Sequence, residues 1–184
     1  MSSVDVRRKC VQPISFTYRA AETGDAHLIS AMLMHAANWD PIRPALTPQQ
    51  LAANPHLSHY ADGWPQPGDL GVVVESAHGV GVGAAWLRYF TAADPSYGFV
   101  DERTPELSIG VDPDARGEGL GTGLCTRLLD AARSRGIERV SLSVEKANPA
   151  TRLYERLGFE TVRDDGDAVT MLWRRTAHSL ASKA

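Results

Sequence analysis

The sequence predicts one domain of the mixed α/β class, with a mostly antiparallel sheet flanked by helices. Three observations lead to this prediction. Segments of alternating or β-branched apolar residues recur along the chain, and amphipathic helical segments lie between some of them. Residues 15–175 contain no internal repeat and no low-complexity linker. A chain of 184 residues suits a single domain of this kind.

The composition argues against several classes of protein. Hydrophobic residues make up 43% of the chain and charged residues 22%, as in soluble globular proteins. The net charge of −3 gives no reason to expect a nucleic-acid partner. No run approaches the ~18 apolar residues of a membrane span, and residues 1–14 lack the apolar core of a secretory signal. Two cysteines, Cys10 and Cys125, predict no disulfide framework. We therefore expect a cytoplasmic protein without a membrane partner.

The N-terminal half combines regular segments with an irregular, proline-rich stretch at residues 39–69. Thr47 followed by Pro48 is a typical helix start within that stretch. The expected elements are a poorly ordered lead at 1–14, a strand at 15–20, a helix from Thr23 to about Asn38, a short helix at 47–53, strands at 70–75 and 80–90 joined by a turn at Ala77-His78-Gly79, and a loop at 91–103.

The C-terminal half is more regular. Glycines that favour a left-handed backbone mark its turns and helix ends. The expected elements are a strand at 107–111, a glycine-bearing loop at 112–119, a helix at 120–135 ended by Gly136, a strand at 140–144, a helix from Asn148 to about Leu157 closed by Gly158, strands at 159–163 and 168–173 joined at Asp165-Gly166, and a frayed tail at 176–184.

A glycine-rich loop between the strand at 107–111 and the helix at 120–135 is the first segment that indicates chemistry. Arg116, Gly119 and Gly121 follow the spacing R-x-x-G-x-G. Glycines let successive backbone N–H groups point at one anion, and the following helix N-terminus adds partial positive charge. The loop therefore suits a pyrophosphate. It matches neither a P-loop nor a dinucleotide fingerprint, and a plain turn before a helix is the alternative.

A second segment, Asn148-Pro149-Ala150-Thr151-Arg152-Leu153-Tyr154-Glu155-Arg156-Leu157-Gly158-Phe159, follows after one helix and one strand. With both segments in this order, the chain resembles the GNAT superfamily of N-acetyltransferases. The resemblance is close over residues 104–163 and loose over the whole order of strands and helices. It implies a GNAT-like fold and acetyl-CoA as co-substrate.

The resemblance also implies which residues contact acetyl-CoA. They are Ile109, Val111, Arg116, Gly117, Gly119, Gly121, Thr122 and Asn148. Ile109 and Val111 would pair their backbone with the pantetheine arm, and the loop would hold the pyrophosphate. Gly110 lies between them, as expected where another backbone approaches or a bulge occurs. Asn148 before Pro149 is alternatively a helix N-cap, and both roles can hold together.

The same resemblance implies two catalytic residues. Glu106 is the candidate base that removes a proton from the amine, with a solvent-facing strand residue or a base acting through water as the alternatives. Tyr154 is the candidate acid for the thiolate, with a core aromatic as the alternative. Cys125 lies among helix leucines and is not expected to act as a nucleophile.

The acceptor site is expected from aromatic residues of the less regular segments, which either line a pocket or cover the sheet. They are Trp39, Tyr60, Trp64, Tyr97 and Phe99. We expect a small-molecule amine as the acceptor, because residues 39–69 are long enough to cover the site. A protein or peptide acceptor and a non-catalytic acyl-CoA sensor are the alternatives, and both a monomer and a homodimer stay open.

No metal site is expected. His56 and His59 lie three residues apart in a proline-rich stretch without a nearby cysteine or acidic ligand. The segment 164–167 lacks the further ligands of a calcium loop and is typical of a hairpin turn.

Overall fold

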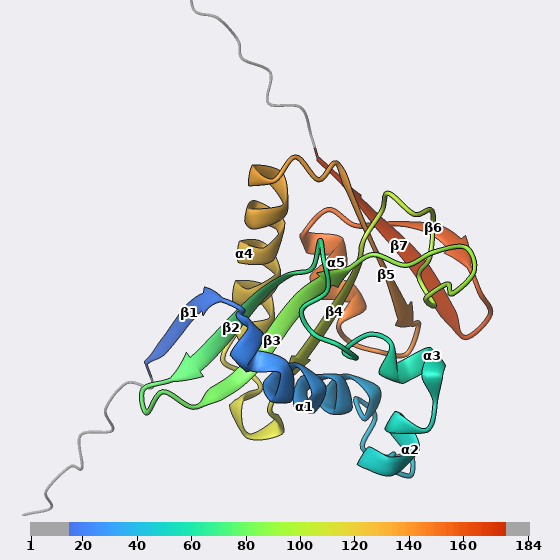
Figure 1. Ribbon diagram of the computed structural model, residues 1–184. Helices are drawn as coiled ribbons and strands as arrows, with labels where there is room; N and C mark the ends of the chain where they lie inside the picture. Colours follow the sequence, from blue (N-terminus) through green and yellow to red (C-terminus); the bar gives the residue numbers. More distant parts are fainter. Residues whose placement is uncertain (1–14, 176–184) are drawn as a thin grey trace, which may run out of the picture.

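The computed structural model describes residues 15–175, so the lead expected at 1–14 and the tail expected at 176–184 lie outside the described residues. The described chain forms a seven-stranded mixed sheet in the order β1-β2-β3-β4-β5-β7-β6. Helices cover both faces of this sheet (Figure 1). The predicted mixed α/β fold with a mostly antiparallel sheet is confirmed.

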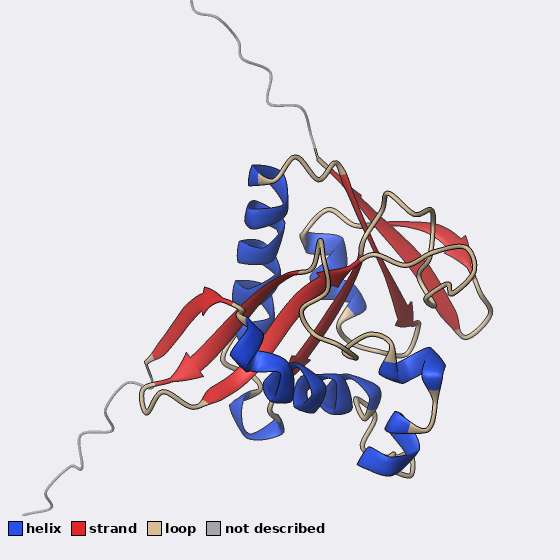
Figure 2. Cartoon of the chain, viewed as in Figure 1, coloured by secondary structure: helices blue, strands red, loops and turns tan. Residues whose placement is uncertain are grey.

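The sheet consists of two antiparallel halves joined by one parallel step. The first half contains β1 (Phe16–Ala20), β2 (Leu70–Ser76), β3 (Gly81–Arg88) and β4 (Glu106–Val111). The second half contains β5 (Arg139–Glu145), β6 (Glu160–Asp164) and β7 (Ala168–Arg174). The halves meet where β4 lies parallel to β5. Figure 2 shows the arrows of these two strands diverging from that meeting point.

Side-chain alternation along the strands divides the core into two layers. On one face, α4 (Leu120–Ser134) and α5 (Thr151–Arg156) pack on residues such as Val74, Leu87 and Leu142. On the other face, α1 (Ala26–Ala37), α2 (Pro48–Ala52) and α3 (Pro55–Ser58) accompany a second cluster that includes Val73 and Trp86. Two short 3-10 helices, Thr23–Asp25 and Pro113–Ala115, precede α1 and α4. Among residues 15–175, no helix combines the length and the hydropathy that a membrane crossing needs.

Three helix starts differ from the predictions. Thr23 does not cap α1, because Glu22 and Asp25 form a reciprocal capping box around a 3-10 turn and α1 begins at Ala26. The C-terminal helix α5 begins at Thr151, after tight turns that follow Asn148. The four-residue helix α3 was not predicted, since its start signal, Asn54 before Pro55, lies among other prolines.

The other differences are small. The strand expected at 80–90 is shorter, and the turns at Gly79 and Gly166 are confirmed with left-handed φ values of 71° and 85°. The short helix that begins after Thr47 is also confirmed, and its Thr47 side chain accepts a hydrogen bond from the Gln50 N–H.

Gly110 brings α1 onto β4. A Cβ atom at this position would lie 2.0 Å from the carbonyl oxygen of Met32, in the middle of α1. The backbone that approaches Gly110 is thus that of α1. The contact fixes the distance between α1 and the strand that carries Glu106.

We expect Gly110→Ala to lower the free energy of unfolding by about 1–3 kcal/mol, as overpacking of a core does. The helix backbone cannot turn away as a flexible side chain would. Urea denaturation would measure the change. Gly24→Ala is the matched control, because an added Cβ there meets no atom within 4 Å and its φ is not left-handed. Equal denaturation midpoints for the two variants would contradict the tight contact.

Candidate active site

The candidate site is the gap where β4 and β5 part. The Ser141 N–H of β5 donates to the Pro105 carbonyl at 3.0 Å. Within the described chain, β4 and β5 share one ladder pair, formed by Glu106 and Ser141. Bonds in a parallel ladder are evenly spaced, so a regular continuation would join the Ser143 N–H to the Leu107 carbonyl. No such second pair is present, and the Ser143 N–H is instead one of the groups that lower the pKa of Glu106. The edge of β4 beyond this point therefore has no strand beside it.

Glu106 is buried, with 3% of its surface exposed. The Tyr60 hydroxyl donates to its Oε1 at 2.9 Å, the Gly98 N–H donates to its Oε2 at 2.9 Å, and the Ser96 hydroxyl also donates to Oε2. These three donors occupy most of the roughly four lone-pair positions of a carboxylate. The solvent-facing position considered as an alternative for Glu106 is wrong.

Two opposing effects act on the Glu106 carboxyl group. Burial raises its pKa above the ordinary value of 4.5, because a charge loses solvation in the interior. The hydrogen bonds from Ser96, Tyr60, Gly98 and Ser143 lower the pKa again, and burial is the larger effect. The pKa thus shifts toward neutral pH, which is the direction that suits a general base.

The N-terminus of α4 offers an anion site beside the gap. Gly117 and Gly119 have left-handed φ values of 88° and 74°, and a Cβ atom on either would meet nothing within 4 Å. Gly119 is the N-cap of α4 and supplies no capping side chain, so the first-turn N–H groups, including those of Gly121 and Thr122, lack a side-chain cap. Open space, helix polarity and these donors suit a phosphate group.

The predicted contacts on β4 flank this helix start. Ile109 and Val111 are half-buried and pack toward the α4–α5 layer. Arg116 is exposed, and its guanidinium donates to the Val111 carbonyl at 3.3 Å and to the His35 carbonyl of α1 at 3.5 Å. The side chain thus lies along the α1–β4 junction next to the glycine loop.

Asn148 lies on the connection from β5 to α5. Its Oδ1 accepts the Ala150 N–H at 2.9 Å and so closes a turn before α5. The N-cap of α5 is Ala150, so the helix N-cap considered for Asn148 is wrong. None of the described residues accepts a hydrogen bond from its Nδ2, which leaves that donor available to a ligand.

Tyr154 lies in α5 on the face opposite to Glu106. It is 7% exposed, and its ring meets Phe159 edge-on at 5.8 Å between centroids. Burial, with Cys125 nearby, raises the pKa of its hydroxyl, so this group keeps its proton. Among the described residues, no hydrogen-bond partner occupies this hydroxyl. Cys125 itself is buried, and burial raises the pKa of its thiol to about 12.

The structure separates the five aromatic residues predicted for the acceptor pocket. Tyr60 and Tyr97 stack at 6.4 Å beside Glu106, and Tyr97 is 54% exposed, with half-buried Phe99 two residues on. Trp64 is a core residue: it is buried in the α1 layer, and its indole N–H donates to the Glu22 carbonyl at 3.1 Å. The pocket prediction is therefore wrong for Trp64, and the sheet-covering alternative applies to it.

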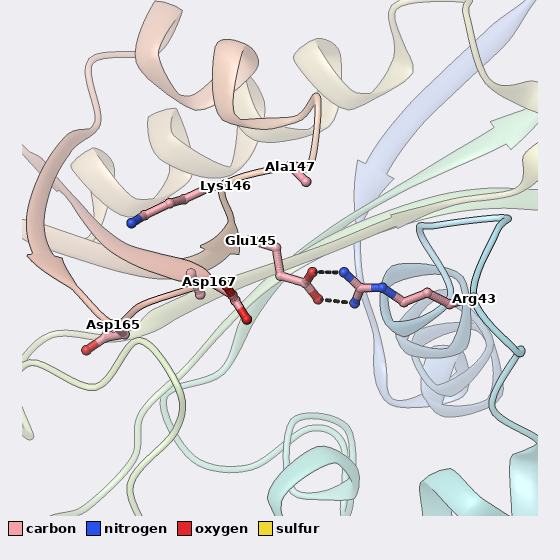
Figure 3. A pocket seen from close by; sticks show the side chains of 7 residues that line it. Arg43, Glu145, Lys146, Ala147, Asp165 and Asp167 are labelled. Carbon is pink, nitrogen blue, oxygen red and sulfur yellow. Dashed lines mark hydrogen bonds and ion pairs between the residues drawn. The ribbon is translucent and has the colours of Figure 1, made fainter.

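Trp39 belongs to a bridge across the open end of the gap. Arg43, in the segment after α1, binds the Glu145 carboxylate at the end of β5 through two guanidinium nitrogens (Figure 3). The Trp39 indole N–H also donates to Glu145, at 3.4 Å. Arg43 and Glu145 line a cavity of about 710 Å³. Its other lining residues are Lys146, Ala147, Asp165, Asp167 and Ala168.

Sequence reasoning missed Ser96, Gly98, Arg43, Ser143 and Glu145. None belongs to a motif, and each meets its partner only through the tertiary fold; Arg43 and Glu145 are 102 residues apart. The one weak signal in the sequence is that residue 98 is a glycine. The structure gives the reason, because a Cβ atom there would lie 2.8 Å from both the Glu106 carboxyl carbon and the Ser143 nitrogen.

The two histidines of the proline-rich stretch do not form a metal pair. The His59 Nδ1 faces the Asp94 carboxylate at 3.2 Å, and its ring packs against Tyr60 and Phe90. Within residues 15–175, no group of three or more histidine, cysteine or acidic side chains is placed to hold a metal ion.

A comparison with known protein families assigns the chain to one of them. The sequence profile of the acetyltransferase (GNAT) family matches residues 39–159, which is more than half of the chain. The chain belongs to the GNAT acetyltransferase family. A mycothiol acetyltransferase of Saccharomonospora viridis is 35% identical over 144 residues, which cover 77% of this chain and 44% of that protein. The chain thus spans less than half the length of the curated relatives it matches.

Solved structures agree with this assignment. The protein yncA of Salmonella typhimurium, solved with acetyl-CoA, has a TM-score of 0.60 and 25% identity, over 92% of this chain and 99% of that one. A phosphinothricin acetyltransferase of Sinorhizobium meliloti, also in complex with acetyl-CoA, has a TM-score of 0.60 and 22% identity, over 86% and 88% of the two chains. The predicted membership of the GNAT acetyltransferase family is confirmed.

We expect Gly119→Val to abolish the rise in Tm that acetyl-CoA causes, because the side chain would occupy the space beside the α4 N-terminus. A ligand that binds only the folded state stabilises it by RT ln(1 + [L]/Kd). Thermal unfolding with and without acetyl-CoA would measure this shift.

Gly136→Val is the matched control. Gly136 lies at the other end of α4 with a left-handed φ of 76° and equally open surroundings. Both variants suffer the same kind of backbone strain, but only Gly119→Val should lose the shift. A full shift in Gly119→Val would contradict the placement of the phosphate site.

Proposed function

We propose that the protein transfers an acetyl group from acetyl-CoA to a primary amine of a small molecule by direct attack on the thioester. The observation that carries this proposal is Glu106, a buried carboxylate at the point where β4 and β5 part, with a pKa raised toward neutrality. In this proposal, acetyl-CoA binds beside the same gap, with its pyrophosphate at the uncapped N-terminus of α4, as expected for a GNAT family member.

The proposed reaction needs one base, one acid and one hydrogen-bond donor. The amine nitrogen forms a bond to the thioester carbon, and the C–S bond breaks. The amine proton goes to Glu106, directly or through water, and the Tyr154 hydroxyl gives its proton to the departing thiolate. A backbone N–H near Ile109–Val111 would donate to the carbonyl oxygen as negative charge develops on it.

The two candidate groups have environments that match these roles. A free alkylamine has a pKa near ~10.4, so most of it is protonated at neutral pH and a base is needed. Burial raises the pKa of the Tyr154 phenol and so keeps it protonated. Burial also raises the pKa of the Glu106 carboxyl group toward neutral pH. Glu106 faces the α1–α3 layer and Tyr154 the α4–α5 layer, so they approach the gap from opposite faces.

A small acceptor is favoured by the bridge from Arg43 and Trp39 to Glu145. This bridge joins the segment after α1 to the end of β5, the strand that parts from β4, and it would hinder an extended peptide from lying along the gap. The relatives named mycothiol acetyltransferase also support a small-molecule acceptor rather than a protein.

A thiol-release assay with acetyl-CoA tests this function against a panel of amines, peptides and aminoglycosides. We expect turnover with small amines and little with peptides. Preferred turnover of peptides would favour a protein acceptor, and binding of acetyl-CoA without turnover of any amine would favour a sensor.

We expect Tyr154→Phe to lower kcat by about 10²–10⁴, the usual contribution of a general acid or base. The ring and its packing against Phe159 remain, so the Kd for acetyl-CoA and the Tm should change little. Steady-state kinetics and calorimetry would separate these quantities. Wild-type kcat in this variant would leave Tyr154 as a packing residue.

We expect Glu106→Gln to lower kcat/KM for the amine by about 10²–10⁴ while acetyl-CoA still binds. Because the folded-state pKa of Glu106 is raised, the carboxylate ionises above pH 4.5, and kcat/KM should fall as the pH drops through that raised pKa. The variant should lose this acidic limb.

The titration of the amine produces an acidic limb as well, so the pH profile needs two amines of different pKa. A limb that follows the amine in both proteins, at equal rates, would show that Glu106 is not the base.

A further inference from the structure

Tyr60 reaches Glu106 from a segment that β3 holds in place. The Trp86 indole N–H donates to the Tyr60 carbonyl at 2.8 Å. The Arg88 guanidinium donates to the carbonyls of His59 at 2.7 Å and Asp62 at 2.8 Å. Arg88 pairs with Glu106 across the β3–β4 ladder, so the residue that fixes the Tyr60 backbone is the direct neighbour of the carboxylate. The position of Tyr60 is therefore set from the sheet, not by the loop in which it lies.

The Tyr60 hydroxyl makes two buried hydrogen bonds. It donates to the Glu106 Oε1 at 2.9 Å and accepts the Tyr97 N–H at 2.9 Å. The second bond fixes the loop whose Ser96 hydroxyl and Gly98 N–H donate to the other carboxylate oxygen. One hydroxyl thus contacts Glu106 directly and also holds the segment that supplies two of its remaining donors.

We propose that Tyr60 is a positioning residue for the acetyl transfer: its hydroxyl holds Glu106 in the orientation and the ionised state that a base requires. This inference rests on the proposed function, in which Glu106 accepts the amine proton. Tyr60 therefore acts through Glu106 and is not an aromatic wall of the acceptor pocket.

Burial alone favours the protonated form of Glu106, which cannot accept a proton. A hydrogen bond to a charged acceptor is stronger than one to a neutral group and favours the ionised form. The bond from Tyr60 accordingly lowers the pKa of Glu106 against the effect of burial. It is the one donor to Oε1 from a side chain in the described network.

The other charged or titratable side chains near Glu106 interact with other residues. Arg88 binds Asp69, with 2.5 Å between Nη2 and Oδ2, and both side chains are almost fully buried. His59 contacts the Tyr60 ring at 4.9 Å between centroids and faces Asp94 through Nδ1. From β5, the nearest groups are the backbone N–H of Ser143 and the uncharged side chain of Ser141.

Tyr60→Phe tests the proposal. We expect the acidic limb of kcat/KM for the amine to move to higher pH by about 1 unit, since one such hydrogen bond to a charged group is lost. Below the limb this shift equals a roughly tenfold loss of kcat/KM. The Kd for acetyl-CoA, measured by calorimetry, should change less than about threefold, because Tyr60 lies away from the α4 N-terminus.

Tyr89→Phe is the matched control. It removes a hydroxyl from a half-buried tyrosine, one residue beyond Arg88, that has no hydrogen bond to Glu106. Its pH profile should overlay that of the wild type. A shift of equal size in both variants would overturn the proposal, since the loss of any nearby tyrosine hydroxyl would then suffice.

A second replacement guards against misfolding of Tyr60→Phe. Site-specific 3-fluorotyrosine at position 60 keeps the ring and strengthens the hydroxyl as a donor, so the acidic limb should move to lower pH. A limb that stays in place in both replacements, while Glu106→Gln still loses activity, overturns the role of Tyr60 alone. Full activity of Glu106→Gln overturns the base assignment and the Tyr60 role together.

Discussion

The parting of β4 and β5 is the constraint on which the rest of the site depends. A parallel pair would continue its ladder if nothing prevented it, because unpaired backbone groups in the interior are costly. Here the ladder contains one pair, Glu106 with Ser141, and the β4 edge beyond it is open. The Glu106 carboxyl group and the Ser143 nitrogen both lie beside Gly98 at this point, each 2.8 Å from where a Cβ atom of residue 98 would be.

The donors that surround Glu106 make this arrangement stable. An isolated buried carboxylate loses much solvation energy, and it persists only with hydrogen bonds at its lone pairs. Those donors come from the loop at residues 96–98 and from Tyr60. The carboxylate at the parting of the strands is thus held by the same contacts that adjust its pKa, so a change in those contacts alters both the local structure and the proposed chemistry.

The residues of the candidate site lie on both faces of the sheet. The α4–α5 layer carries the glycine loop and Tyr154, while the α1–α3 layer carries Glu106, Tyr60 and the bridge from Arg43 to Glu145. Gly110 holds the second layer close, because the α1 backbone rests directly on β4 there. A donor that enters from one face and an acceptor that enters from the other would meet at the strand between them.

The sequence alone determined the fold class and most elements, and it located the glycine-bearing loop before α4. Those features depend on local signals: the periodicity of apolar residues, the turn glycines, and the R-x-x-G-x-G spacing of Arg116, Gly119 and Gly121. Only the tertiary structure decided the environment of Glu106, because Tyr60, Ser96 and Gly98 reach it from segments that carry no motif. It also assigned Trp64 to the core and Tyr60 to the carboxylate, which composition cannot distinguish. Local patterns fix what a backbone does over a few residues, whereas a pKa and a hydrogen-bond partner depend on which distant side chains the fold brings together.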